Sequence, residues 1–224
     1  MPKAIFFDVD DTLLNFGLSS KSALADVFQH FGLELDDAIK QRYYGINTGL
    51  WDEQKQGLRT VQNVIDTRFR LLFEDLGWDV DVDAFRDVYQ GQLAQSHVLE
   101  QGALETVRTL SQRYDLYVAS NSILAMQTSR LRLAQLLPYF QDLFVSNDIG
   151  YEKPDARFFE TCLQRSQRQA QDIVFVGDSL EADMVGATSC GMTACWYNPQ
   201  QKPVPQDLDI NHTIHSLAQL TQLF

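Results

Sequence analysis

The sequence predicts an α/β fold in which helices cover both faces of a doubly wound parallel sheet, with a separate helical domain inserted into it. Two observations predict this fold: short apolar runs recur along the chain between helical patterns, and one long stretch contains no convincing strand. A strand that is apolar at every position is buried on both faces, as the strands of parallel sheets are. The runs cover residues 4–7, 116–119, 143–145, 173–176 and 193–197.

Helical periodicity appears between these runs. Apolar residues three and four positions apart mark one helix within 104–114 and another around 158–163. A short loop over 199–205 precedes a last strand and helix. Strands that alternate with helices are typical of a Rossmann-like, doubly wound sheet. We expect this core to comprise residues 1–15 and 97–224.

The inserted stretch, residues 16–96, reads as helical throughout. Three apolar stripes with helical spacing lie within 24–31, 61–76 and 85–89. Glycines between and within them are expected to act as caps or turns. These glycines are Gly32, Gly45, Gly49, Gly57 and Gly77. The sequence therefore predicts a helical domain that enters after the first strand and returns the chain to the sheet.

Composition restricts the possible partners. Hydrophobic residues make up 45% of the chain, and the net charge is −12. An acidic surface argues against a nucleic-acid polymer, which requires a positive face, and against anionic membranes. A small phosphorylated substrate stays possible, because a metal and a few cations can neutralise it locally.

The three cysteines, Cys162, Cys190 and Cys195, show no framework spacing. An odd number of cysteines without the spacing of a disulfide framework is typical of a cytoplasmic protein whose thiols are reduced. The first residues lack the pattern of a signal peptide, and no apolar run approaches the roughly 20 residues of a membrane span.

Polar residues that can take part in catalysis or ligand binding stand at the ends of the predicted strands, where a parallel sheet forms its ligand crevice. The first group is Asp8, Asp10 and Thr12, directly after the first apolar run. Carboxylates two apart on an extended strand end point the same way, and their repulsion must be relieved by a cation or a shared proton. A solvated turn or a helix N-cap is the alternative interpretation.

The second and third groups supply a hydroxyl and a cation. Ser120 and Asn121 follow the second run, where a helix N-terminus can hold a phosphate oxygen. An ordinary serine N-cap explains Ser120 equally simply. Lys153, which precedes Pro154, can neutralise an anion, although most lysines are merely solvated.

The fourth group is Asp178 with Asp183, at the end of the run over 173–176. Hard carboxylate oxygens there suit Mg²⁺, which takes few protein ligands and keeps several waters. The alternative interpretation is that the two acids lie at a helix N-terminus and only interact favourably with the helix dipole. The four groups occur in order, each at a buried strand end, which favours one shared site.

Taken together, these motifs resemble those of the haloacid dehalogenase superfamily. The resemblance covers essentially the whole chain, and the inserted helices resemble the α-helical cap of some members. Segments 47–51 and 191–198 resemble the pyrimidine 5'-nucleotidase branch. Two positions depart from the family pattern: Ser122 replaces a glycine that is frequent in the second motif, and Asn15 replaces an acid.

The resemblance implies a magnesium-dependent phosphohydrolase with Asp8 as the nucleophile. Asp10 would be the general acid and base, and Mg²⁺ would be bound by Asp8, Asp178 and the backbone carbonyl of Asp10. Ser120, the Asn121 amide and Lys153 would bind the phosphate, and Lys153 would also stabilise the transition state. Thr12 and Asp183 would support these groups, Asp183 by orienting Lys153 or the metal shell.

The acid at position 10 separates the chemistries of the superfamily. Dehalogenase members lack it, because a halide leaving group needs no proton. A phosphonatase would need a Schiff-base lysine in the cap. The cap lysines Lys21, Lys40 and Lys55 do not stand in apolar patterns that would depress a lysine pKa.

The expected substrate is a small phosphorylated metabolite, namely a nucleoside monophosphate, acted on by a monomer or homodimer. Tyr43, Tyr44 and Trp51 are candidates to stack on a nucleobase, or else simply form the core of the cap. A sugar-phosphate or other small-metabolite phosphatase and a phosphomutase stay open as alternatives. A non-catalytic binding protein on the same fold is the remaining one.

Overall fold

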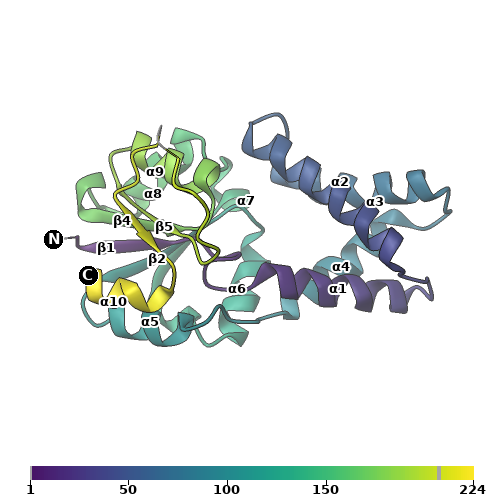
Figure 1. Ribbon diagram of the computed structural model, residues 1–224, viewed down its shortest axis with the longest axis horizontal. Coiled ribbons are helices and arrows are strands. Elements are labelled where there is room, and N and C mark those ends of the chain that lie inside the picture. The colour runs from purple at the N-terminus through teal and green to yellow at the C-terminus, as the bar shows by residue number, and fades with distance from the viewer. Residues whose placement is uncertain (1, 206–207) are drawn as a thin grey trace. The chain divides into compact units, whose positions relative to one another are not determined.

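The computed structural model describes residues 2–205 and 208–224, and it divides into two compact units (Figure 1). One unit comprises residues 1–16 and 97–224, and the other comprises residues 17–96. The first is built on a six-stranded sheet with the order β3-β2-β1-β4-β5-β6, and every adjacent pair is parallel. The strands are β1 (Ala4–Phe7), β2 (Asp115–Ser120), β3 (Phe140–Val145), β4 (Ile173–Gly177), β5 (Thr193–Tyr197) and β6 (His212–Ile214). The predicted α/β fold is thereby confirmed.

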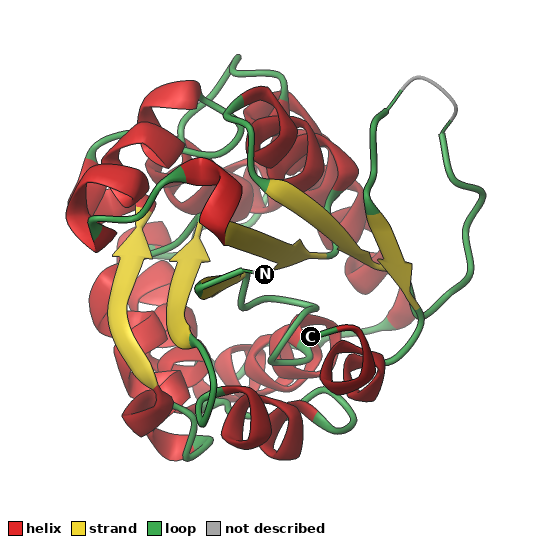
Figure 2. Cartoon of the chain, turned by 90° about the vertical axis from the view of Figure 1, so that its left-hand side faces the viewer, coloured by secondary structure: helices red, strands yellow, loops and turns green. Residues whose placement is uncertain are grey.

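Strand β1 lies at the centre of the sheet and is buried along its whole length. Its alternate residues enter two hydrophobic clusters, one on each face, because side chains of a strand point to opposite sides. Ile5 and Phe7 join one cluster, and Ala4 and Phe6 join the other. In Figure 2, helices lie on either side of the strands.

Helices α5 (Ala103–Leu110), α6 (Leu124–Leu133) and α10 (Leu220–Leu223) contribute to the cluster that contains Phe7. Helices α8 (Ala156–Ser166) and α9 (Val185–Ser189) contribute to the cluster that contains Phe6. The short helix α7 (Ser146–Ile149) follows β3, and a π-helical turn (Leu180–Met184) follows β4. Single 3-10 turns, 137–139, 170–172 and 217–219, connect other elements.

The register of the sheet places the C-terminal ends of β1, β2 and β4 side by side. Phe7 at the end of β1 is aligned with Val118 of β2 and with Val176 of β4. The residues that follow these positions therefore leave the sheet at one edge. Asp8 extends this alignment, since its backbone N–H donates to the Val176 carbonyl at 2.9 Å.

The second unit contains helices only. They are α1 (Phe16–His30), α2 (Asp37–Lys55), α3 (Val61–Leu76) and α4 (Val82–Gln95). Asp36, Thr60 and Asp81 cap α2, α3 and α4, each accepting a backbone N–H from the first turn. Among the described residues, no helix combines the length and the apolar character needed to cross a membrane.

The glycines of this unit do not all mark helix ends. Gly77 ends α3 with φ of 66°, in the left-handed region that favours glycine. Gly45 and Gly49, by contrast, lie inside α2. The expectation that both would form caps or turns is wrong, because a helix packed through Tyr43 and Leu50 tolerates the weak helix propensity of glycine on its other positions.

Candidate active site

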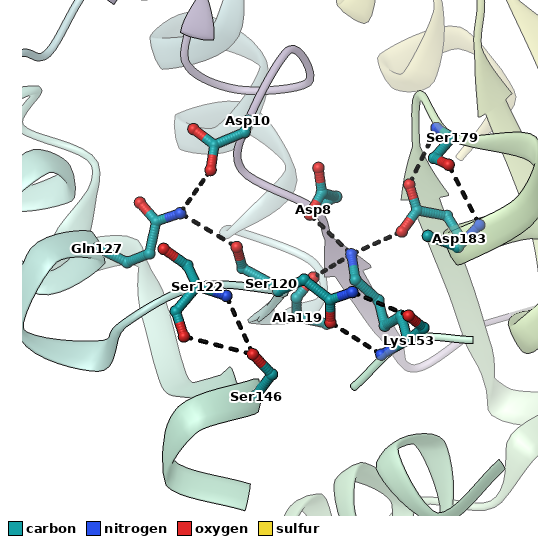
Figure 3. Close-up of polar contacts among 12 residues, drawn as sticks. Asp8, Asp10, Ala119, Ser120, Ser122, Gln127, Ser146, Lys153, Ser179 and Asp183 are labelled. Carbon is teal, nitrogen blue, oxygen red and sulfur yellow. Dashed lines mark hydrogen bonds and ion pairs between the residues drawn. The ribbon is translucent and has the colours of Figure 1, made fainter. Parts of the chain in front are cut away.

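Lys153 connects the acids at the edge of the sheet. Its ammonium donates to Asp8 Oδ1 at 2.7 Å, to Asp183 Oδ1 at 2.6 Å and to the Ala119 carbonyl at 2.9 Å (Figure 3). The three acceptors come from the ends of β1, β2 and the turn after β4. Only 2% of the lysine side chain is exposed, so all three N–H donors are used inside the protein.

Electrostatics in this cluster follow from burial. Burial raises the pKa of Asp8 to about 7, against the attraction of Lys153, which lowers it. Burial alone would lower the pKa of Lys153, but Asp183 and Asp8 hold it above its ordinary value. Burial also raises the pKa of Asp178, and the nearby charges of Asp8 and Asp183 add to the effect. The site therefore holds more acid groups than its lysine can neutralise.

The donor set fits a hard divalent cation. Asp8, Asp178 and Asp183 each offer a carboxylate oxygen, and these oxygens lie within 4.8 Å of one another. Mg²⁺ prefers carboxylate oxygens and would relieve the repulsion that raises the pKa of Asp8 and Asp178. Asp183 has other partners too, because its second oxygen accepts the Ser179 N–H at 3.1 Å. Both oxygens of Asp183 therefore accept hydrogen bonds, one from Lys153 and one from the Ser179 backbone.

Gly177 makes room for Asp183. A Cβ at position 177 would overlap the Asp183 carboxylate. Only glycine therefore lets the acid reach across the end of β4 to Lys153. This close approach explains why a glycine stands between the apolar run of β4 and Asp178.

The Asn121 side chain fixes the backbone of Lys153. Its Nδ2 donates to the Lys153 carbonyl and its Oδ1 accepts the Lys153 N–H, both at 2.8 Å. This paired contact ties the segment after β3 to the end of β2. The Asn121 backbone amide was the group expected at the phosphate, so the side chain adds a structural task that the sequence did not reveal.

Ser120 and Ser122 are both buried at the end of β2. The Ser122 N–H donates to Ser146 Oγ at 3.1 Å, and that hydroxyl donates to the Ser122 carbonyl at 3.3 Å (Figure 3). The serine that departs from the family glycine therefore sits in a backbone position held by α7. Ser120 is the last residue of β2, and its contact with a phosphate stays a prediction.

Asp10 is held by two side chains of α6. Its Oδ1 accepts from Arg130 Nη1 at 2.5 Å, and its Oδ2 accepts from Gln127 Nε2 at 2.8 Å. Gln127 Nε2 also donates to Ser120 Oγ at 3.1 Å, as Figure 3 shows. Gln127 and Arg130 were not among the predicted site residues. The sequence feature that points to them is their spacing: they stand three positions apart, on the helical face that also carries the apolar Leu131.

Thr12 and Asp11 shape the loop after β1. Thr12 is fully buried, and its hydroxyl has no hydrogen-bond partner. Asp11 has a positive φ of 55°, and its Oδ1 accepts the Phe16 N–H at 2.9 Å. Asn15, the second departure from the family pattern, donates to Glu100 Oε1 at 2.7 Å, so it ties the two connecting segments of the core together.

The three aromatic candidates of the helical unit differ in exposure. Tyr43 is 1% exposed, stacks on Phe69 with ring centroids 5.3 Å apart, and shares a hydrogen bond between hydroxyls with Tyr89 at 3.2 Å. These contacts match the alternative that Tyr43 belongs to the core of this unit. Tyr44 and Trp51 are half-buried on α2.

Comparison with known proteins agrees with this geometry. The family model described as haloacid dehalogenase-like hydrolase matches residues 2–191. The HAD-hydrolase YfnB of Bacillus subtilis is 35% identical over 97% of this chain and 93% of its own length. The crystal structure of YfnB bound to magnesium superposes with a TM-score of 0.92, at 34% identity over 99% of this chain and 98% of that one.

Two further relatives carry a named activity. The pyrimidine 5'-nucleotidase PynA of Streptococcus pneumoniae is 36% identical over 88% of this chain and 84% of its own length. The pyrimidine 5'-nucleotidase YjjG of Escherichia coli is 26% identical over 98% of this chain and 96% of its own. The resemblance read from the four motifs is confirmed, and this chain belongs to the haloacid dehalogenase-like hydrolase family.

Proposed function

We propose that the protein is a magnesium-dependent phosphomonoester hydrolase that acts on nucleoside 5'-monophosphates through an aspartyl-phosphate. One observation carries the proposal: Asp8 lies at the end of the central strand, bonded to the ammonium of Lys153, with Asp178 beside it. A carboxylate held in this way has a cation to offset its charge and a hard-metal site next to it.

The first half-reaction forms the intermediate. An Asp8 oxygen attacks phosphorus, the bond between phosphorus and the ester oxygen breaks, and the leaving oxygen takes a proton from Asp10. Lys153 stabilises the negative charge on the transferred phosphoryl group, and Ser120 and the Asn121 amide bind its oxygens. Mg²⁺ held by Asp8, Asp178 and the Asp10 carbonyl would neutralise charge between nucleophile and phosphate.

The second half-reaction restores the enzyme. Asp10, now a carboxylate, removes a proton from a water molecule as that water attacks the phosphorus of the aspartyl-phosphate. The acyl–phosphate P–O bond breaks, inorganic phosphate leaves, and the Asp8 carboxylate is regenerated. Asp10 ends the cycle protonated, ready for the next leaving group.

The choice of substrate rests on the relatives and on Asp10. Two relatives that cover most of this chain are named pyrimidine 5'-nucleotidases. A nucleoside 5'-oxygen is a poor leaving group without a proton, and Asp10 is the acid positioned to supply one. A dehalogenase has no use for such an acid, which favours phosphoryl transfer over dehalogenation within the same family.

A substrate screen with Mg²⁺ tests this proposal. We expect pyrimidine nucleoside 5'-monophosphates to be hydrolysed fastest, a chelator to abolish the rate, and added Mg²⁺ to restore it. Asp8→Asn should lower turnover by at least roughly 10³-fold while circular dichroism stays unchanged. Sugar phosphates hydrolysed far faster than any nucleotide would refute the nucleotidase assignment. Turnover that survives Asp8→Asn would refute the mechanism itself.

A further inference from the structure

We propose that Arg130 and Gln127 are positioning residues that set the direction of hydrogen bonding at Asp10 and Ser120. The inference rests on the proposed function, because it assigns these residues to the proton donor of that reaction. It goes beyond the four motifs, since both residues lie on α6, outside every motif segment.

The contacts form one connected network. Arg130 Nη1 donates to Asp10 Oδ1 at 2.5 Å and to Gln127 Oε1 at 3.1 Å. Gln127 Nε2 then donates to Asp10 Oδ2 at 2.8 Å and to Ser120 Oγ at 3.1 Å. The proposed acid and the proposed phosphate-binding hydroxyl are therefore joined through a single amide group.

Arginine decides the orientation of that amide. A guanidinium has donors only, so the Gln127 atom that faces Arg130 must be its carbonyl oxygen. The amide nitrogen consequently faces Asp10 and Ser120, and it can only donate to them. Ser120 Oγ accepts this bond, which leaves the Ser120 hydroxyl proton to donate to a phosphate oxygen.

The same contacts hold the Asp10 carboxylate in one pose. Each of its oxygens accepts from a different side chain, and the two donors stand one turn apart on the same helix. Figure 3 shows the Asp10 carboxylate directed at Gln127. Arg130 and Gln127 are both fully buried, whereas the Asp10 side chain is 27% exposed. The supporting pair is thus fixed by packing, while the acid itself stays accessible to substrate.

Burial of an arginine beside an acid also has a purely structural explanation. An ion pair inside a protein is costly to assemble and costly to break, so loss of Arg130 would disturb stability in any case. A positioning role has a further consequence that a structural role lacks. The contact of Arg130 with Asp10 should matter only when Asp10 must deliver a proton.

Leaving groups of different basicity separate the two roles. A nucleoside 5'-alkoxide must be protonated as it leaves, whereas p-nitrophenolate leaves without a proton. The ratio kcat/KM reports the steps up to formation of the aspartyl-phosphate and release of the alcohol. Loss of Asp10 positioning should therefore reduce kcat/KM for a nucleotide and hardly change it for p-nitrophenyl phosphate.

The experiment compares Arg130→Met with Asp10→Asn and with the double variant. We expect Arg130→Met to lower kcat/KM for uridine 5'-monophosphate by roughly 30-fold, which is less than the roughly 10²–10⁴-fold that general acid catalysis contributes in full, and for p-nitrophenyl phosphate by less than about threefold. Arg130→Lys should recover part of the loss. The double variant should be no slower on the nucleotide than Asp10→Asn alone, because Arg130 acts through Asp10.

Arg132→Met is the matched control, since Arg132 is an exposed arginine of the same helix, and both of its rates should equal those of the wild type. Equal losses on both substrates, with additive effects in the double variant, would overturn the inference. If Arg130→Met does not fold, Arg130→Lys provides the same comparison of the two substrates, with a smaller loss on the nucleotide. Gln127→Met does not replace it, because Gln127 also donates to Ser120 and its loss should slow both substrates. Failure of the nucleotidase proposal would be seen separately, because the wild-type enzyme would not hydrolyse nucleotides. Another alkyl phosphate that it does hydrolyse would then replace uridine 5'-monophosphate in the comparison.

Discussion

At the scale of single residues, the site depends on the shape of one ammonium group. Lys153 directs three N–H bonds at three separate acceptors, at 2.6–2.9 Å, from a position with almost no solvent. A tetrahedral ammonium matches that arrangement, whereas a planar guanidinium does not.

The position of polar residues at predicted strand ends identified Asp8 and Lys153 as candidates. The bonds from Gln127 and Arg130 to Asp10 could not be predicted, because nothing in the spacing of α6 tells a buried polar pair from a solvated one.

Substitutions of Lys153 test this residue-scale account. Lys153→Met leaves two buried carboxylates without their cation and should reduce the free energy of unfolding by about 3 kcal/mol, measured by urea denaturation with a chelator present. Lys153→Arg keeps the charge and should still lose activity at least roughly tenfold.

Lys3→Met provides the control for this pair of variants. Lys3 bonds to Asp172 with 61% of its side chain exposed, so the loss should stay below about 1 kcal/mol. If Lys153→Met were as stable as Lys3→Met, the charge network would not contribute as described.

At the scale of elements, close backbone approaches decide where glycine is required. Helix α8 packs on α9 so tightly that a Cβ at Gly186 would overlap the ring of Phe159. Gly91 lies on the exposed face of α4, and nothing approaches within 4 Å of the position its Cβ would take. In the sequence, Gly186 stands between Val185 and Ala187, and Gly91 stands between Gln90 and Gln92. Neighbouring residues alone do not show how closely another helix approaches a glycine, because that distance depends on which helix packs against which.

The same substitution should therefore have opposite effects at the two glycines. Gly186→Ala forces Phe159 to move and should lower the free energy of unfolding by about 1–3 kcal/mol. Gly91→Ala removes backbone entropy from the unfolded chain and should raise it by about 0.5–1 kcal/mol. Thermal and urea unfolding of both variants provide the measurement. A Gly186→Ala variant as stable as the wild type would contradict the packing of α8 on α9.

At the scale of the whole molecule, the sequence predicts the fold class well and the strand order not at all. Apolar runs identify buried parallel strands, and their alternation with helices predicts layers on both faces. The order β3-β2-β1-β4-β5-β6 depends on which strands pair, and every run is similarly apolar, so composition does not select neighbours. The parallel arrangement predicts that the motifs lie at one edge of the sheet, but their closeness also depends on the pairing of β1 with β2 and β4, which the sequence does not show.

Capture of the phosphorylated enzyme tests the central claim most directly. Asp10→Asn removes the group that activates water, while p-nitrophenyl phosphate needs no proton to react, so the intermediate should accumulate. After acid quench and digestion with trypsin, peptide 4–21 should carry one phosphoryl group, located at Asp8 by tandem mass spectrometry, in proportion to the p-nitrophenol released. Steady release of p-nitrophenol with Asp8 unmodified, or a phosphoryl group on another residue, would contradict the assignment of Asp8 as the nucleophile.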